Sequence, residues 1–232
     1  MHIPDGYLSP QTWVPLFGVF AATTTIAVKK VKEKVPARNI PYLAMAGAFS
    51  FIIMMFNLPV PGGTTGHAVG AAVIAILLGP WPATIAVSVA LIIQALVFGD
   101  GGITAIGANC FNMAVFMPFT AYFIFRLFRV RPHNRIRASV AGFVSGYLSL
   151  ALTALLTAVE FGIQPLIASS PDGKPLYCPY DLSVAVPVML TGHLLLFGIV
   201  EGILTALVVS YFLKNEPGLI YAVNNAGTDE NK

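Results

Sequence analysis

Residues 184–213 of the chain read VAVPVMLTGHLLLFGIVEGILTALVVSYFL, and Glu201 is the only residue in this stretch with a formal charge at neutral pH. About 20 apolar residues suffice for a helix to cross the hydrocarbon core of a bilayer, so the stretch predicts a transmembrane helix. Of the 232 residues, 56% are hydrophobic and only 10% are charged, against roughly a quarter charged in soluble domains. We therefore expect an all-α integral membrane protein.

Six further apolar runs precede this stretch, and each is followed by charged or helix-breaking residues. The seven runs cover about 11–28, 41–58, 67–79, 83–98, 103–127, 138–163 and 184–213. The third run is short, and it follows a segment rich in proline and glycine, residues 57–63, that no helix should cross intact. We expect a bundle of seven transmembrane helices that forms a single domain over residues 1–232.

The basic residues predict how this bundle is oriented. If the amino terminus lies outside, all but one of the 13 lysines and arginines fall on the inner side, and only Lys174 lies outside. The inner residues are Lys29, Lys30, Lys32, Lys34, Arg38, Arg126, Arg129, Arg131, Arg135, Arg137, Lys214 and Lys232. Because basic loop residues remain on the cytoplasmic side of a membrane, we expect the amino terminus outside, the carboxyl terminus inside and the protein in the cell membrane.

This orientation sorts the loops into two groups. Residues 1–10, the loop 62–67, the loop around Asp100 and the loop 164–183 are expected on the external face, where a solute would first be met. The polar tail from about 214 to 232 is expected in the cytoplasm and frayed.

Several functional classes are excluded by the same sequence. The net charge is only +3, and the basic residues cluster beside apolar runs, so we expect no nucleic-acid partner. The chain has no Walker, GxSxG, HExxH or dinucleotide-binding motif, which predicts that it is not an enzyme and does not itself use ATP. No basic segment, signal-length apolar core or cleavage site precedes the first run, so we expect the chain to begin at Met1.

His2 is the first candidate metal ligand, because it directly follows the amino-terminal residue. A free Met1 amine, the His2 backbone nitrogen and His2 Nδ1 can close a five-membered and a six-membered chelate ring on one ion. Planar nitrogen ligation favours Ni(II) or Cu(II). Pro4 has no amide proton and turns the chain, which prevents ligation by successive amides. The alternative is a histidine that stands second by chance.

His67 is the candidate for the fourth ligand that this arrangement lacks. It lies in GGTTGHAVG, residues 62–70, on the same predicted face as Met1. The neighbouring glycines let the backbone approach a ligand closely, and Thr64 or Thr65 could hydrogen-bond the second ring nitrogen. The alternative is an incidental histidine in a helix-capping loop.

His193 and Glu201 lie inside the last apolar run, where ionisable side chains are costly and usually functional. Their spacing of about two helical turns puts them on one helix face. They predict either a relay for protons or ions, or a structural polar pair inside the bundle.

Three more polar residues have two possible roles, and a fourth, Glu160, has one. Asp100, Asn109 and Asn112 lie at the outer end of the fifth run, as hydrogen-bond acceptors for the ligands or as turn and cap residues. Glu160, near the outer end of the sixth run, is expected at the membrane interface.

Several motifs together resemble the CbiM/NikM family, the substrate-binding membrane components of energy-coupling factor transporters for nickel and cobalt. The motifs are MHIPDGYL at 1–8, GH at 66–67, GGITAIGAN at 101–109, NM at 112–113, GH at 192–193 and EG at 201–202. The resemblance implies a six-helix core preceded by an additional helix, with the amino-terminal segment entering the bundle. It implies the Met1 amine, the His2 amide and imidazole, and His67 as metal ligands, and it assigns no ligation to Asp100.

The resemblance also implies a function and partners. The chain is expected to bind Ni(II), or else Co(II), as a transported substrate and to have no organic cofactor. Its implied partners are an integral membrane coupling subunit, one or two ATPase subunits and, in some systems, a small additional membrane subunit. The alternative function is a self-sufficient, proton-coupled transporter of divalent metals that uses His193 and Glu201.

Overall fold

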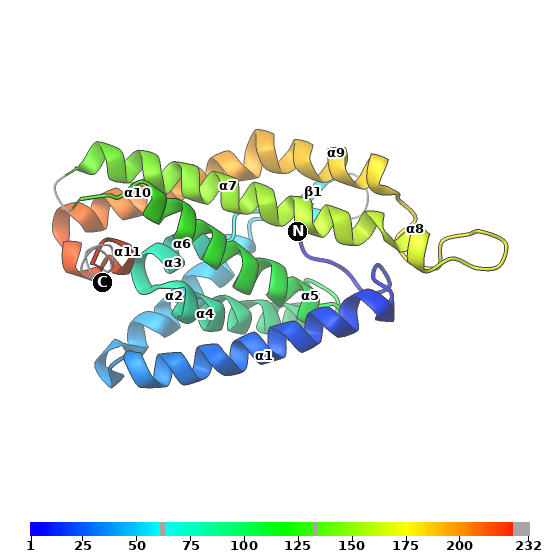
Figure 1. Cartoon of the computed structure of the whole chain (residues 1–232), viewed down its shortest axis with the longest axis horizontal. Coiled ribbons are helices and arrows are strands. Elements are labelled where there is room, and N and C mark those ends of the chain that lie inside the picture. The colour runs from blue at the N-terminus through cyan, green and yellow to red at the C-terminus, as the bar shows by residue number, and fades with distance from the viewer. Residues whose placement is uncertain (61–63, 132–133, 225–232) are drawn as a thin grey trace.

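The structure of the protein is a computed structural model that describes residues 1–60, 64–131 and 134–224. The long helices are α1 (Pro10–Lys34), α2 (Ile40–Met54), α4 (Pro80–Ile93), α6 (Met117–Leu127), α7 (Arg135–Gly162), α9 (Leu182–Gly192) and α10 (Gly198–Asn215). The short helices are α3 (Ala71–Leu78), α5 (Ile106–Cys110), α8 (Gln164–Ile167) and α11 (Tyr221–Asn224). The long helices run side by side along the long axis of the molecule (Figure 1).

Six helical segments are long and apolar enough to cross a membrane. They are Pro10–Lys34, Ala37–Met54, Pro80–Phe98, Ile106–Leu127, Arg135–Ile167 and Leu182–Asn215. They coincide with six of the seven predicted runs, which confirms a multi-pass helical membrane protein. The last segment joins α9 to α10 without a break, as the run 184–213 predicted.

The third predicted run has a different structure from the other six. Its helix, α3, begins at Ala71 and is only eight residues long, and six of those residues are buried. Before it, Leu58–Val60 (β1) pairs antiparallel with Thr64–Gly66 (β2), a hairpin that the apolar pattern did not predict. Gly70 has a φ of +73°, which favours glycine and ends the extended segment where α3 begins. A seventh membrane-crossing helix stays a prediction.

Three of the spans contain a π-helical segment. These segments are Gln94–Phe98, Phe111–Phe116 and His193–Phe197. Such segments frequently occur at functional sites, because the extra residue shifts the side chains that follow. Each lies at a residue that the sequence analysis singled out: Asp100 follows the first, Asn112 is in the second and His193 begins the third.

Helices α7 and α10 pack backbone to backbone. A Cβ atom at Gly146 would lie 2.7 Å from Thr205 Oγ1 and 2.8 Å from Glu201 O, so this contact needs glycine. Close approach at small residues is the usual basis of helix packing in membranes. It holds the turn that carries Glu201 against α7.

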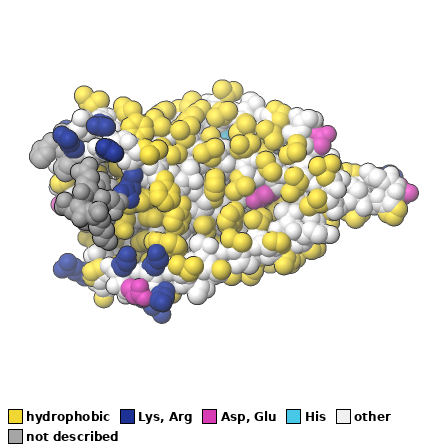
Figure 2. Space-filling model, viewed as in Figure 1, with side chains coloured by type: hydrophobic (Ala, Val, Ile, Leu, Met, Phe, Trp, Pro, Cys, Tyr) yellow, Lys and Arg dark blue, Asp and Glu magenta, His cyan; other side chains and the backbone are white. Residues whose placement is uncertain are grey.

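Basic side chains gather at one end of the visible face (Figure 2), where α1 and α10 end. The loop after α8 projects from the other end (Figure 1). This separation agrees with the predicted orientation, which itself stays a prediction. The carboxyl-terminal segment is better packed than expected, because Ile220 is fully buried and Tyr221 approaches Gly79. Residues 220–223 of the predicted tail therefore pack against the bundle, and residues 225–232 lie outside the described part of the chain.

Candidate metal centre

The amino terminus lies inside the bundle, between helices far apart in sequence (Figure 1). Met1, His2 and Ile3 are 1%, 4% and 0% exposed. The Ile3 N–H donates to Asn109 Oδ1 at 2.8 Å, and Asn109 Nδ2 donates to the Ile3 carbonyl at 3.1 Å. The Gly102 N–H donates to the same carbonyl at 2.8 Å. Because buried backbone groups need partners, these bonds hold the first three residues in one position.

The rest of the segment is fixed to the loop before α5 and to α7. Asp5 accepts hydrogen bonds from the backbone N–H groups of Ile103 and Thr104 at 3.0 and 2.9 Å. The hydrogen bonds from Thr104 lower the pKa of the Asp5 carboxyl. The Ser9 N–H donates to Gln164 Oε1 at 2.9 Å. The segment is thus anchored at both ends, with its first residues threaded between the helices.

His2 and His67 meet at this amino terminus. Their rings stack with centroids 4.6 Å apart and an interplanar angle of 26°, and His67 is fully buried. The Met1 amine donates to the Thr65 carbonyl, two residues before His67. The structure therefore brings together all three residues that the sequence singled out as metal ligands.

The hydrogen bond of His67 sets its tautomer. Nδ1 lies 3.0 Å from the Ala68 carbonyl, which can only accept, so Nδ1 carries the proton and Nε2 presents a lone pair. Nε2 has no hydrogen-bond partner in the described part of the chain. From the sequence, Thr64 or Thr65 was expected to hydrogen-bond the second ring nitrogen. That expectation was wrong, because the ring turns toward its own backbone.

His2 faces a carboxylate as well as His67. Its Nδ1 lies 3.2 Å from Asp100 Oδ1, and Asp100 Oδ2 accepts a hydrogen bond from Asn57 Nδ2 at 3.1 Å. Burial lowers the pKa of the Met1 amine from 8.0 to about 5, against the charge of Asp100. Burial likewise lowers the pKa of His2, against its hydrogen bond to Asp100. At neutral pH the amine and the imidazole are therefore uncharged, as metal ligands must be.

Side chains alone do not form a metal site here. Within residues 1–60, 64–131 and 134–224, no three His, Cys, Asp or Glu residues come together as a possible metal-binding group. A metal ion between His2 and His67 would therefore need ligands besides these side chains.

His193 and Glu201 hydrogen-bond to different backbone groups and not to each other. Glu201 Oε2 accepts hydrogen bonds from the N–H groups of Val69 and Gly70 at 2.8 and 3.0 Å. It therefore satisfies backbone N–H groups that have no helical partner at the start of α3 and holds the loop that carries His67. His193 Nδ1 lies 2.7 Å from the Met189 carbonyl, one turn back on its own helix. These contacts favour the structural interpretation of the pair over a relay.

Two roles were not visible in the sequence. Glu160 is 5% exposed and accepts a hydrogen bond from Asn112 Nδ2 at 2.8 Å, so it is buried between helices, while its place at the membrane interface stays a prediction. Asn109 is not a helix cap: its side chain hydrogen-bonds both the N–H and the carbonyl of Ile3, and we call this pair of bonds the Asn109 clamp. Both pairs join residues 48 and 106 positions apart, and such distances leave no local pattern.

The fold and the buried amino terminus define a multi-pass membrane protein with an internal, nitrogen-rich site. The family profile described as CbiM, "Cobalt uptake substrate-specific transmembrane region", matches residues 2–219. The chain belongs to this CbiM family, which confirms the resemblance.

Individual relatives agree with this assignment. The chain is 46% identical over 223 residues to the probable fused nickel transport protein LarMN of Lactiplantibacillus plantarum, covering 95% of this chain and 67% of the relative. It is 49% identical over 222 residues to the fused nickel transport protein NikMN of Rhodobacter capsulatus, covering 95% and 64%. The chain thus spans about two thirds of the length of these fused relatives. A crystal structure of a truncated transition metal transporter superposes with a TM-score of 0.87 at 47% identity, covering 92% of this chain and 99% of that one.

Proposed function

We propose that this protein captures Ni(II), or alternatively Co(II), as the substrate-binding subunit of an ATP-driven importer of the energy-coupling factor class. The observation that carries the proposal is the burial of the Met1 amine beside the stacked imidazoles of His2 and His67. The cobalt-uptake description of the family and the nickel transport named for two relatives support the choice of cations.

The proposed site has four nitrogen ligands. Three come from the Met1 amine, the His2 backbone nitrogen and His2 Nδ1, which form two fused chelate rings, and the fourth is His67 Nε2. The uncharged Met1 amine and His67 Nε2 each present a lone pair in the arrangement described above. His2 Nδ1 does so when the proton of the neutral ring lies on Nε2. The His2 amide must lose its proton when the metal binds.

Asp100 has a specific place in this proposal. The chelate uses His2 Nδ1, the same atom that lies 3.2 Å from Asp100 Oδ1. Metal binding therefore exchanges the Asp100 contact for a bond to the cation. Until then, the contact with Asp100 keeps the ring oriented.

The experiment that tests this function is a calorimetric titration of the purified protein with Ni(II), Co(II), Cu(II) and Zn(II). Planar nitrogen ligation favours Ni(II) and Cu(II) over Zn(II), so we expect Ni(II) to bind at least about tenfold more tightly than Zn(II). Equal affinities for all four cations, or none for Ni(II) and Co(II), would contradict the proposal.

ATP-driven transport needs partner subunits, because this chain has no nucleotide-binding motif with which to use ATP itself. We propose a membrane coupling subunit and ATPase subunits, with a small accessory membrane subunit as a further possible component. The protein itself is not an enzyme in this proposal, because a closed four-nitrogen site leaves no open position for a reacting molecule.

A self-sufficient, proton-coupled transporter is the competing function. The two functions differ in liposomes that contain this protein alone: our proposal predicts no metal accumulation when a pH gradient is applied. Accumulation driven by the gradient without any ATPase would favour the competing function.

A further inference from the structure

We propose that the basic end of the bundle binds an anionic phospholipid, with the lipid phosphate beside Lys30 and Lys34 and an acyl chain in the groove between α2 and α4. This site lies away from the metal centre. It is independent of the proposed transport function.

The phosphate would occupy a cavity of about 260 Å³ between the end of α1, the start of α2, the turn from α3 to α4 and residues 218–224. Lys30 and Lys34 are its charged lining residues, and Asn39, Tyr42, Tyr221 and Asn224 are polar. The two lysines are four residues apart, so they lie on one face of α1. None of the described residues that line the cavity is acidic. Its charge therefore suits a phosphate group.

Trp81 orients one of these lysines. The Lys30 ammonium lies 4.6 Å from the centroid of the Trp81 ring, a cation–π contact. Tryptophan is enriched at the level of the lipid headgroups. The cavity is thus placed where a headgroup would lie, at the end of the molecule that carries the basic side chains (Figure 2).

The acyl chain would occupy an apolar groove of about 540 Å³ between α2 and α4. The groove follows α2 from Ile40 to Phe51, and Leu43 lines both the groove and the cavity. The two depressions are therefore adjacent, with Leu43 between them. At 1.5 Å per helical residue the groove runs roughly 16 Å, close to half of the hydrocarbon core of about 30 Å. That is the depth of one leaflet.

These features together favour a phospholipid over other anions. A free phosphate would fill the cavity and gain nothing from the groove. A zwitterionic lipid would bring a positive group next to two lysines. Basic pockets between helices at the headgroup level are suited to anionic lipids.

The first test is native mass spectrometry of the full-length protein titrated with phosphatidylglycerol, with phosphatidylcholine and glycerol phosphate as comparisons. The double variant Lys30→Gln/Lys34→Gln removes the two lining charges. Lys29→Gln/Lys32→Gln is the matched control, since it removes two charges from α1 that do not line the cavity. A lysine near anionic lipid contributes about fivefold in affinity, so we expect binding of the first phosphatidylglycerol to weaken about 25-fold in the first variant and less than about threefold in the control.

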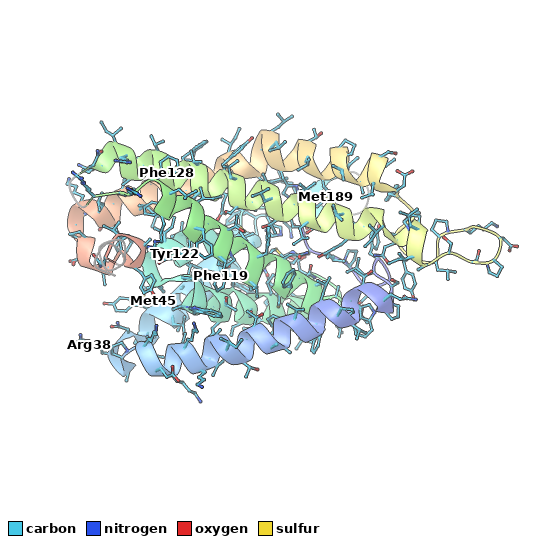
Figure 3. All side chains as sticks on the ribbon, viewed as in Figure 1. Arg38, Met45, Phe119, Tyr122, Phe128 and Met189 are labelled. Atoms are coloured by element: carbon cyan, nitrogen blue, oxygen red, sulfur yellow. The ribbon has the colours of Figure 1, made fainter. Side chains whose placement is uncertain are left out.

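The second test blocks the groove. Ala44→Phe fills it, whereas Met45→Phe is the matched control on α2, because Met45 is 66% exposed and does not line the groove. Figure 3 shows the control position, Met45, near Arg38 at the basic end of the molecule. We expect Ala44→Phe to weaken binding of phosphatidylglycerol with 16-carbon chains about tenfold and to leave a six-carbon analogue unchanged. Unchanged nickel affinity in all four variants would verify that they are folded.

Three outcomes would overturn the proposal. Equal weakening by the two lysine pairs would show a diffuse electrostatic effect. Equal binding of phosphatidylcholine would show that the cavity does not select charge. Tenfold tighter phosphatidylglycerol binding by Asp229→Asn/Glu230→Gln would identify the acidic tail of the chain itself as the natural occupant.

Discussion

Replacing Asn109 with alanine should loosen the amino-terminal segment. The Ile3 carbonyl would keep its bond from the Gly102 N–H at 2.8 Å, but the Ile3 N–H would lose its acceptor at a fully buried position. An unsatisfied buried donor costs about 1–3 kcal/mol. The equilibrium between the seated and the displaced segment should therefore shift about 5- to 150-fold toward the displaced state.

Hydrogen exchange measures this shift directly, because protection of the amides in residues 2–8 reports the opening equilibrium of the segment. We expect their protection to fall by that factor in Asn109→Ala without metal, and nickel affinity to fall with it. Asn215→Ala is the control: it removes an exposed amide side chain that bonds only within α10, and it should leave protection of residues 2–8 unchanged. Protection within twofold of the wild type in Asn109→Ala would refute the role of Asn109 as a clamp.

Two further predictions concern the ligands and pH. His67→Ala should weaken nickel binding by at least about 100-fold, by calorimetry, while the thermal midpoint changes little; unchanged affinity would remove His67 from the ligand set. Nickel affinity should fall about tenfold for each unit of pH between 8 and 6, since the His2 amide releases one proton on binding. Protonation competes with the metal, so the fall should steepen as pH drops through about 5, the lowered pKa of the Met1 amine. A constant affinity from pH 8 to pH 5 would contradict amide ligation.

The apolar pattern of the sequence was sufficient to locate the spans, because a helix needs about 20 predominantly apolar residues to cross the hydrocarbon core. It was insufficient for the run 67–79. That run is as apolar as the others, yet its first residues, 67–70, are not helical. The N–H groups of Val69 and Gly70 bond to Glu201 instead of to a preceding helical turn. The conformation of this segment therefore depends on a residue 132 positions away in the sequence, and a hydropathy pattern does not report such a contact.

Part of the metal centre could be predicted from the sequence, for a different reason. Chelation by the first two residues is local chemistry, so His2 in second position was informative by itself. The convergence of His67 on it followed from the predicted orientation. The Asp100 contact and the Asn109 clamp depend on how the loop after Phe98 folds over Ile3. Only the packed structure gives that geometry.

The measurement that most directly tests the account compares nickel binding by three forms of the protein: one with a free Met1 amine, one extended by a single glycine and one acetylated at Met1. Intact mass spectrometry establishes each terminus. A Met1→Leu variant with a free amine is the control, because only the main-chain nitrogen of residue 1 is proposed to bind. We predict that the extended and acetylated forms lose at least about 100-fold in affinity, and that Met1→Leu binds within about threefold of the wild type. Equal affinity of the three forms would show that the amine is not a ligand, and the four-nitrogen site would be contradicted.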